Sequence, residues 1–181
     1  MGTPTRKNIR LTGYDYSQSG AYFITICART MEHQFGNMVE GKVELSNCGI
    51  IAERNIRSIS EHMKSVCIDN YVVMPNHVHL ILTIIPDAVE TRYIVSESEP
   101  RQHATTERTP YMASLQVKSK QIVPKTIQQY KASVTRDSGI AGLWQPRFHD
   151  HIIRDEAEYQ RIWRYIDQNP ANWESDRYHT Q

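Results

Sequence analysis

Residues 66–85 have the sequence VCIDNYVVMPNHVHLILTII, and this stretch decides the fold. It contains two strongly apolar runs, Val66 to Val73 and Val78 to Ile85, both rich in β-branched residues. The segment Met74–His77 separates them, and Pro75 interrupts any regular element there. This pattern is typical of two neighbouring strands at the centre of a sheet.

Two further elements are expected before this pair of strands. Ala21 to Arg29 is rich in β-branched and aromatic residues, which predicts a strand. Leu45 to Met63 has apolar residues at helical spacing, with Ser46 and Asn47 as candidate caps, which predicts a helix. Glycines between these two elements indicate a hairpin or a loop.

The rest of the chain completes a mixed pattern. Pro86 to Pro124 is polar and aperiodic, so we expect an irregular loop at about 86–124. Three more elements follow: a helix at Lys125 to Arg136, a strand at Arg147 to Arg154 and a helix at Asp155 to Gln168. The order strand, helix, strand, strand, helix, strand, helix favours an α+β fold of the ferredoxin-like (RRM-like) type. In that fold an antiparallel sheet carries its helices on one face.

The composition suggests one folded unit. With 181 residues, 39% of them hydrophobic, the chain can bury one core, and we expect a single domain over 1–181. No apolar run reaches the ~20 residues of a membrane-spanning helix, so we expect a cytoplasmic protein with no membrane partner. Cys27, Cys48 and Cys67 are widely spaced among apolar or helical residues, which favours reduced core thiols over a disulfide or zinc framework.

Basic residues gather in two segments although the net charge is only +1. Residues 108–136 contain six basic residues and no acid, and residues 1–14 contain three basic residues and no acid. Such segments can line a phosphate-binding surface, with solvated charged faces as the alternative. The candidates for DNA contact are Arg6, Lys7, Arg10, Lys118, Lys120, Lys125, Lys131, Arg136 and Arg154.

A pair of histidines begins the most apolar predicted strand. His77 and His79 are two residues apart, so on a strand both imidazoles point to one face and the alternating apolar residues point to the other. Two neutral imidazoles side by side can start a divalent metal site, whereas ordinary hydrogen-bonded histidines are the alternative. His149 and His151 form a competing pair in more polar surroundings, typical of an exposed edge, where a structural or DNA-facing role is expected.

The last predicted helix carries the other chemically suggestive pair. Tyr165 and Asn169 are four residues apart and therefore share one helix face. An amide oxygen suits Mg²⁺ or Mn²⁺, and a phenol beside the metal can act as a nucleophile. A packed ring and a C-terminal cap are the alternative interpretation of the same spacing.

Taken in order, several motifs resemble those of the REP-associated tyrosine transposases, which are relatives of the single-tyrosine insertion-sequence transposases. The motifs are GYDY at 13–16, YFIT at 22–25, YVVMPNHVHL at 71–80, LWQ at 143–145, HIIRDE at 151–156 and YIDQNP at 165–170. They run from about residue 6 to residue 173, in the family's order. A lone His-x-His would be weak support, whereas the ordered set is specific.

The resemblance implies roles for individual residues. His77 and His79 match the family's metal-binding pair, Tyr165 matches its nucleophile, and Asn169 matches the polar residue that completes the metal site. Tyr130 is a rival nucleophile on a predicted helix, but only Tyr165 precedes the Ile-x-x-Asn-Pro motif. The implied cofactor is Mg²⁺ or Mn²⁺.

The resemblance also implies an activity and a partner. We expect a metal-dependent endonuclease and transposase that cleaves and rejoins single-stranded DNA next to hairpins, such as REP-like palindromes, through a 5′-phosphotyrosine intermediate. The protein would be a monomer or a homodimer associated with the bacterial nucleoid. Three alternatives stay open: a DNA-binding regulator of the same fold that does not cut, a nickase of the rolling-circle or relaxase type, and a metal hydrolase for small molecules.

Overall fold

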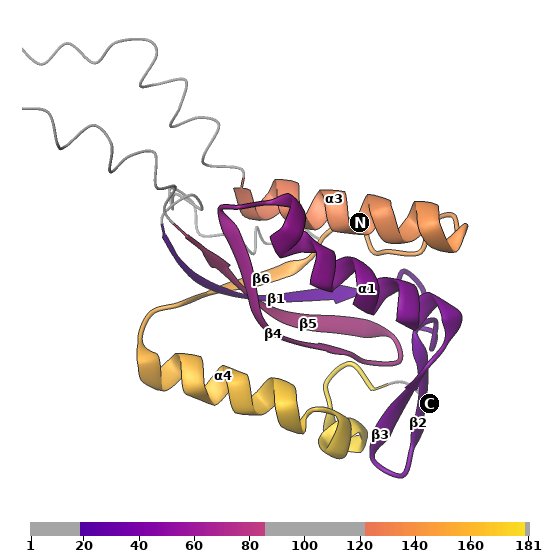
Figure 1. Ribbon diagram of the computed structural model, residues 1–181. Coiled ribbons are helices and arrows are strands. Elements are labelled where there is room, and N and C mark those ends of the chain that lie inside the picture. Colours follow the sequence, from indigo (N-terminus) through magenta and orange to yellow (C-terminus); the bar gives the residue numbers. More distant parts are fainter. Residues whose placement is uncertain (1–18, 86–121, 180–181) are drawn as a thin grey trace, which may run out of the picture.

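A computed structural model describes residues 19–85 and 122–179 (Figure 1). Its elements in chain order are β1 (Gly20–Cys27), β2 (Gly36–Val39), β3 (Lys42–Leu45), α1 (Asn47–His62), β4 (Val66–Val73), β5 (His77–Ile84), α3 (Ile122–Ser138), β6 (His149–Ile153), α4 (Glu156–Gln168) and the 3-10 helix η2 (Pro170–Ser175). The expected α+β class and the expected order are confirmed, and β2 and β3 form the hairpin that the glycines indicated. Within the described residues, no helix is long and apolar enough to cross a membrane.

The main sheet has four antiparallel strands in the order β4-β5-β1-β6. β5 and β1 are therefore central, and β6 is an edge strand, as expected for the polar segment around His149. Thr25 of β1 lies opposite His79 on one side and opposite His149 on the other. Directly opposite residues point to the same face, so these three side chains share one face of the sheet.

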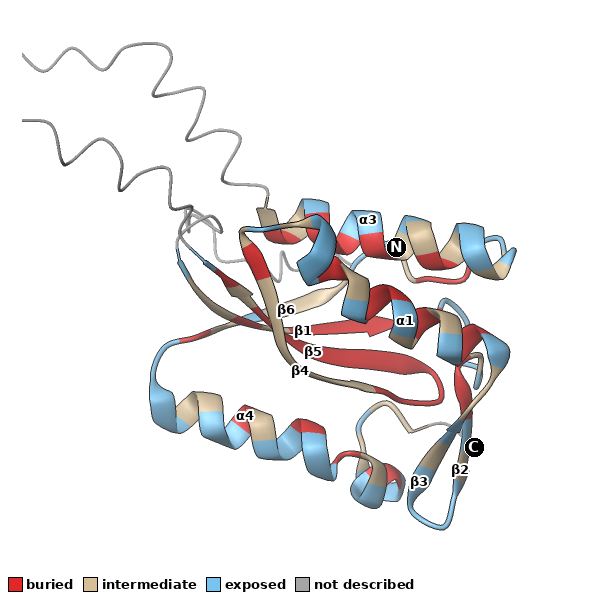
Figure 2. Ribbon diagram, viewed as in Figure 1, coloured by how far each residue is buried: buried red, intermediate tan, exposed pale blue. Residues whose placement is uncertain are grey.

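The two faces of the sheet are covered by different helices (Figures 1 and 2). Alternate residues of β5, including Val78 and Leu80, pack into the large core with α1 and α3. On the opposite face, Ile81 packs with Ile162 and Ile166 of α4. The prediction that the helices share one face is therefore wrong for α4. The reason is that the sheet also carries apolar residues on this second face, among them Phe23, Ile81 and Ile153, and α4 covers them.

Two helix starts show how local sequence sets the boundaries. Ser46 caps α1, because its hydroxyl accepts a hydrogen bond from the Gly49 N–H at 3.1 Å. α3 begins at Ile122, not at Lys125, so residues 122–124 belong to a helix and not to the predicted loop. Pro124 lies in the first turn, where its missing N–H has no intrahelical partner to lose. The rest of that loop lies outside the described residues.

Hydrogen bonds to β4 hold α4 in place. The Tyr159 hydroxyl donates to Asp69 Oδ2 at 3.0 Å, and Asn70 Nδ2 donates to Asp167 Oδ1 at 2.9 Å. Asp155 caps the start of the helix through the Glu158 N–H. These contacts, together with the apolar stripe of α4, position Tyr165 over the face that carries the histidine pair.

The three cysteines are free thiols, as expected. Cys27 and Cys48 are buried, and Cys67 is half-buried. Burial raises the pKa of the Cys27 thiol to about 11, so this thiol stays protonated at neutral pH.

Candidate active site

The histidine pair lies at the start of the central strand β5. Both side chains are buried, with exposed fractions of 0% for His77 and 1% for His79, and their ring centroids are 4.4 Å apart. Burial lowers the pKa of His77 to about 4 and also lowers the pKa of His79, on which His77 and Arg177 act in the same direction. Both imidazoles are therefore neutral at neutral pH, which is the form that binds a metal.

A chain of hydrogen bonds determines which nitrogen of His77 is available. The Asn76 amide donates to the backbone oxygens of Met31 at 3.1 Å and Tyr178 at 2.8 Å, so its Oδ1 must face His77. This oxygen can only accept, so His77 Nδ1, at 2.8 Å, carries the ring proton. His77 Nε2 then presents a lone pair, and it is buried with no hydrogen-bond partner in the described structure.

His79 connects the pair to the tyrosine of α4. Its Nδ1 lies 2.8 Å from the Thr25 hydroxyl, and its Nε2 lies 3.3 Å from the Tyr165 hydroxyl. Tyr165 is 38% exposed, and its ring also contacts Phe23 edge-on at 5.9 Å. The tyrosine predicted from the motif thus lies against the predicted histidine pair, and one of its edges is open to solvent.

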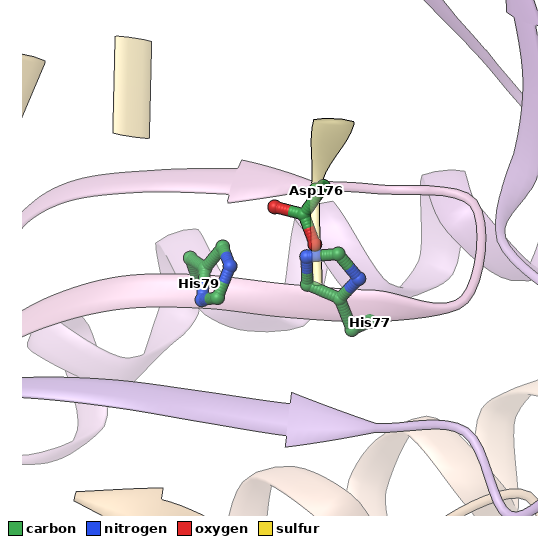
Figure 3. A group of neighbouring side chains, drawn as sticks. All are labelled: His77, His79 and Asp176. Atoms are coloured by element: carbon green, nitrogen blue, oxygen red, sulfur yellow. The ribbon is translucent and has the colours of Figure 1, made fainter. Parts of the chain in front are cut away.

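An aspartate completes the cluster (Figure 3). Asp176 follows η2, and a ligand atom of each of His77, His79 and Asp176 lies within 4.8 Å of the others. Asp176 Oδ2 accepts hydrogen bonds from the Tyr165 hydroxyl at 3.1 Å and from Asn169 Nδ2 at 2.7 Å. Asp176 could not be predicted from the sequence, because its spacing from Tyr165 follows no helix or strand period and depends on the turn of the chain through η2.

Asn169 lies where the motif predicted a ligand. It ends α4 and is 2% exposed, and its Oδ1 is buried without a hydrogen-bond partner among the described residues. A buried carbonyl oxygen or ring nitrogen with no partner costs about 1–3 kcal/mol, and two such atoms, Asn169 Oδ1 and His77 Nε2, occur in this one cluster. A divalent ion would satisfy both. Imidazole nitrogens with amide and carboxylate oxygens form a donor set that suits Mn²⁺ or Mg²⁺.

The environment of Tyr165 works against ionisation of its phenol. Burial raises the pKa of Tyr165, the negative charge of Asp176 raises it further, and Arg177 opposes both. The phenol is therefore protonated at neutral pH, and it needs a proton acceptor to become a nucleophile. Asp176 Oδ2 is the carboxylate oxygen to which it already donates.

The rival residues do not belong to this cluster. Tyr130 is buried in the core of the opposite face, where its hydroxyl donates to Ala52 O at 3.4 Å. His151 pairs with Glu158 of α4 at 2.8 Å, and His149 lies 6.5 Å, ring to ring, from Tyr178. Neither belongs to the metal-type cluster that the described residues contain.

The residues predicted to contact DNA lie in different parts of the chain. Lys131 Nζ donates hydrogen bonds to the backbone oxygens of Gln145 at 2.9 Å and Arg147 at 3.0 Å, so its ammonium group is engaged inside the protein. Burial lowers the pKa of Lys131 to about 8. Lys125 and Arg136 are exposed on α3, on the face of the sheet opposite the histidine pair. Arg154 is exposed after β6. The candidates outside the described residues are Arg6, Lys7, Arg10, Lys118 and Lys120.

The chain is similar to known proteins in sequence and in fold. No protein-family profile matches the sequence. An uncharacterized protein of Haemophilus influenzae is 34% identical over 180 residues, which cover 97% of this chain and 94% of that protein. A solved structure of a REP-associated tyrosine transposase bound to a REP hairpin covers 95% of this chain and 74% of its own, with a TM-score of 0.52 and 21% identity. The chain belongs to the same family as the Haemophilus influenzae protein, and its fold is that of the REP-associated tyrosine transposase.

Proposed function

We propose that this protein is a metal-dependent transposase that cleaves and rejoins single-stranded DNA next to a hairpin, with Tyr165 as the nucleophile. One observation carries the proposal. The Tyr165 hydroxyl lies 3.3 Å from His79 Nε2 and 3.1 Å from Asp176 Oδ2, in a cluster where two buried ligand-type atoms have no hydrogen-bond partner among the described residues. A structural cluster would be expected to pair those atoms within the protein.

The ligands for the metal come from three elements. Strand β5 would supply His77 Nε2 and His79. The end of α4 would supply Asn169 Oδ1, and the segment after η2 would supply the carboxylate of Asp176. When bound, a divalent ion supplies Lewis-acid polarisation of a phosphate oxygen and stabilises the charge that develops there. Mn²⁺ and Mg²⁺ both fit this donor set.

The protein residues account for the covalent step. Asp176 Oδ2 accepts the hydroxyl proton of Tyr165, and Tyr165 Oη attacks the phosphorus of the scissile linkage. The bond from phosphorus to the 3′ oxygen breaks, and that oxygen takes up one proton to become a 3′-hydroxyl. The other product is a 5′-phosphotyrosine. Because the phosphodiester energy is retained, a 3′-hydroxyl can reverse the step and join a new DNA end without ATP.

The geometry favours a site completed within one chain. Tyr165 of α4 contacts His79 of β5 in the same chain, and the hydrogen bonds of Tyr159 and Asn70 hold α4 on its own sheet. A monomer would therefore be competent, and a homodimer would carry two separate sites. A DNA substrate also agrees with a cytoplasmic protein associated with the nucleoid.

The choice of a hairpin substrate is supported by the fold and by the sequence motifs. The solved transposase with this fold is bound to a REP hairpin. Binding of such DNA should weaken steeply as salt rises, since each neutralised phosphate releases counterions. A plain duplex should bind more weakly than a hairpin with a single-stranded flank.

The test is cleavage of a labelled oligonucleotide that folds into a hairpin with single-stranded flanks, in the presence of Mn²⁺ or Mg²⁺. Wild-type protein should cut one strand, while His77→Ala, His79→Ala and Tyr165→Phe should fold and fail to cut. Tyr130→Phe is the matched control and should cut normally. Cleavage by a protein that lacks both His77 and His79 would contradict the proposal and transfer the metal site to His149 and His151. Tight binding without cleavage by wild type would favour the DNA-binding regulator.

A further inference from the structure

An arginine, Arg177, lies beside the cluster. Arg177 follows Asp176, it is exposed, and among the described residues its guanidinium makes no ion pair. Its neighbour Asp176 is engaged elsewhere, because Oδ2 faces Tyr165 and Asn169 while Oδ1 accepts the Tyr178 N–H at 2.6 Å. The positive charge of Arg177 is therefore not neutralised by an ion pair with Asp176.

The guanidinium rests on a ring that belongs to the site. Arg177 Cζ lies 4.6 Å from the centroid of the Tyr178 ring, which is a cation–π contact. The Tyr178 ring lies in turn 4.7 Å from the ring of His77 and 5.7 Å from the ring of His79. The Tyr178 backbone oxygen accepts a hydrogen bond from Asn76 at 2.8 Å, which ties this ring to the start of β5. Arg177 is thus held next to the histidine pair and exposed to solvent at the same time.

The charge of Arg177 reaches the reactive groups. Burial and Asp176 raise the pKa of Tyr165 while Arg177 acts to lower it, and the same arginine adds to the lowering of the pKa of His77 and His79 by burial. At Tyr165 the positive charge of Arg177 thus offsets part of the negative charge of Asp176, which would otherwise repel a phosphate that approaches for attack. An arginine also offers paired N–H donors that match two phosphate oxygens, and its stacked, planar group loses little freedom when it binds.

We propose that the Arg177 guanidinium binds a phosphate of the DNA strand that enters the site beside Tyr165. This inference rests on the proposed DNA substrate, and it adds a contact that neither the basic segments nor the motifs of the sequence indicated. The part of the acid-free segment 108–136 that the structure describes lies on α3, on the other face of the sheet, so its described basic residues are away from the strand at the active site. Arg177 is suited to that role because it is a charged group beside the nucleophile that has no protein counter-ion in the described chain.

The test measures binding in EDTA, where no cleavage occurs, by fluorescence anisotropy of a hairpin oligonucleotide with a single-stranded flank. A series of oligonucleotides carries one neutral methylphosphonate linkage each, moved along the flank. For wild type, one linkage should weaken binding about tenfold, as expected for the loss of one charge-assisted contact. For Arg177→Gln the native oligonucleotide should bind about tenfold more weakly, and the same linkage should have no further effect. The dependence of the logarithm of the binding constant on the logarithm of the salt concentration should also be less steep for Arg177→Gln than for wild type, by about the slope of one phosphate contact.

Two variants separate this role from a structural one. Arg177→Lys keeps the charge but loses the stacked pair of donors. Its affinity for the native oligonucleotide should therefore lie between those of Arg177→Gln and wild type, and the sensitive methylphosphonate linkage should weaken its binding less than it weakens that of wild type. Arg54→Gln removes an exposed arginine of α1, on the opposite face, and should leave binding and the linkage profile unchanged. The inference is overturned if no linkage distinguishes wild type from Arg177→Gln, or if Arg54→Gln weakens binding equally. The outcome is independent of cleavage, so a protein that binds through Arg177 without cutting would support this inference while contradicting the proposed function.

Discussion

Acid should destabilise the metal-free protein through its buried histidines. Burial lowers the pKa of His77 to about 4, whereas a histidine in the unfolded chain titrates near 6.5. Below about pH 6.5 the unfolded chain therefore binds more protons than the folded chain, so the free energy of unfolding decreases as the pH falls toward 4. The lowered pKa of His77 corresponds to a decrease in the free energy of unfolding of roughly 2 kcal/mol between pH 7.5 and pH 5. His79, whose pKa burial also lowers, contributes in the same direction.

Urea denaturation in EDTA at about pH 7.5 and about pH 5 measures this loss, and variants assign it. His77→Gln cannot titrate in this range, so its stability should depend less on pH than that of wild type, by roughly 2 kcal/mol over the same interval. His62→Gln removes an exposed histidine at the end of α1 and should keep the full dependence. Equal losses in wild type and His77→Gln would refute the conclusion that His77 is buried and neutral.

Three further substitutions test other parts of the structure. Gly49→Ala would place a Cβ 1.9 Å from Phe35 O, and urea denaturation should show a loss of stability of about 3 kcal/mol. Gly20→Ala is the control: its Cβ would meet nothing within 4 Å, and it should destabilise the protein by less than about 1 kcal/mol. Lys131→Met leaves the backbone oxygens of Gln145 and Arg147 without their donor and should cost about 1–3 kcal/mol without weakening DNA binding in an anisotropy assay. Asn169→Ala should weaken Mn²⁺ binding about tenfold or more in calorimetry, whereas Asn172→Ala, an exposed amide nearby, should not.

Much of the fold could be predicted because local signals and tertiary packing agree. The two apolar runs around Pro75 became β4 and β5, and the two-residue spacing of His77 and His79 placed both rings on one face. Tyr165 and Asn169 share one face of α4 because a four-residue spacing is close to one helical turn. These features depend on periods of two and 3.6 residues, which the sequence displays directly.

The parts that could not be predicted depend on long-range packing. A sheet with apolar residues on both faces does not indicate which helix will cover which face, so the position of α4 was missed. Asp176 reaches the site only because η2 turns the chain back toward β5, and no period marks that turn. The hydrogen bonds from Lys131 to two backbone carbonyls could not be predicted either, because those carbonyls belong to a later segment of the chain.

Identifying the residue that becomes covalently attached to DNA tests the central claim most directly. Wild-type protein incubated with the hairpin oligonucleotide and Mn²⁺ or Mg²⁺ should form an adduct that survives denaturation. Mass spectrometry of its peptides should locate the 5′-phosphate on Tyr165, and Tyr165→Phe should form no adduct while it still binds metal and DNA. An adduct on another tyrosine, or DNA cleavage by wild type with no adduct, would contradict the account, and the latter would mean that water is the nucleophile.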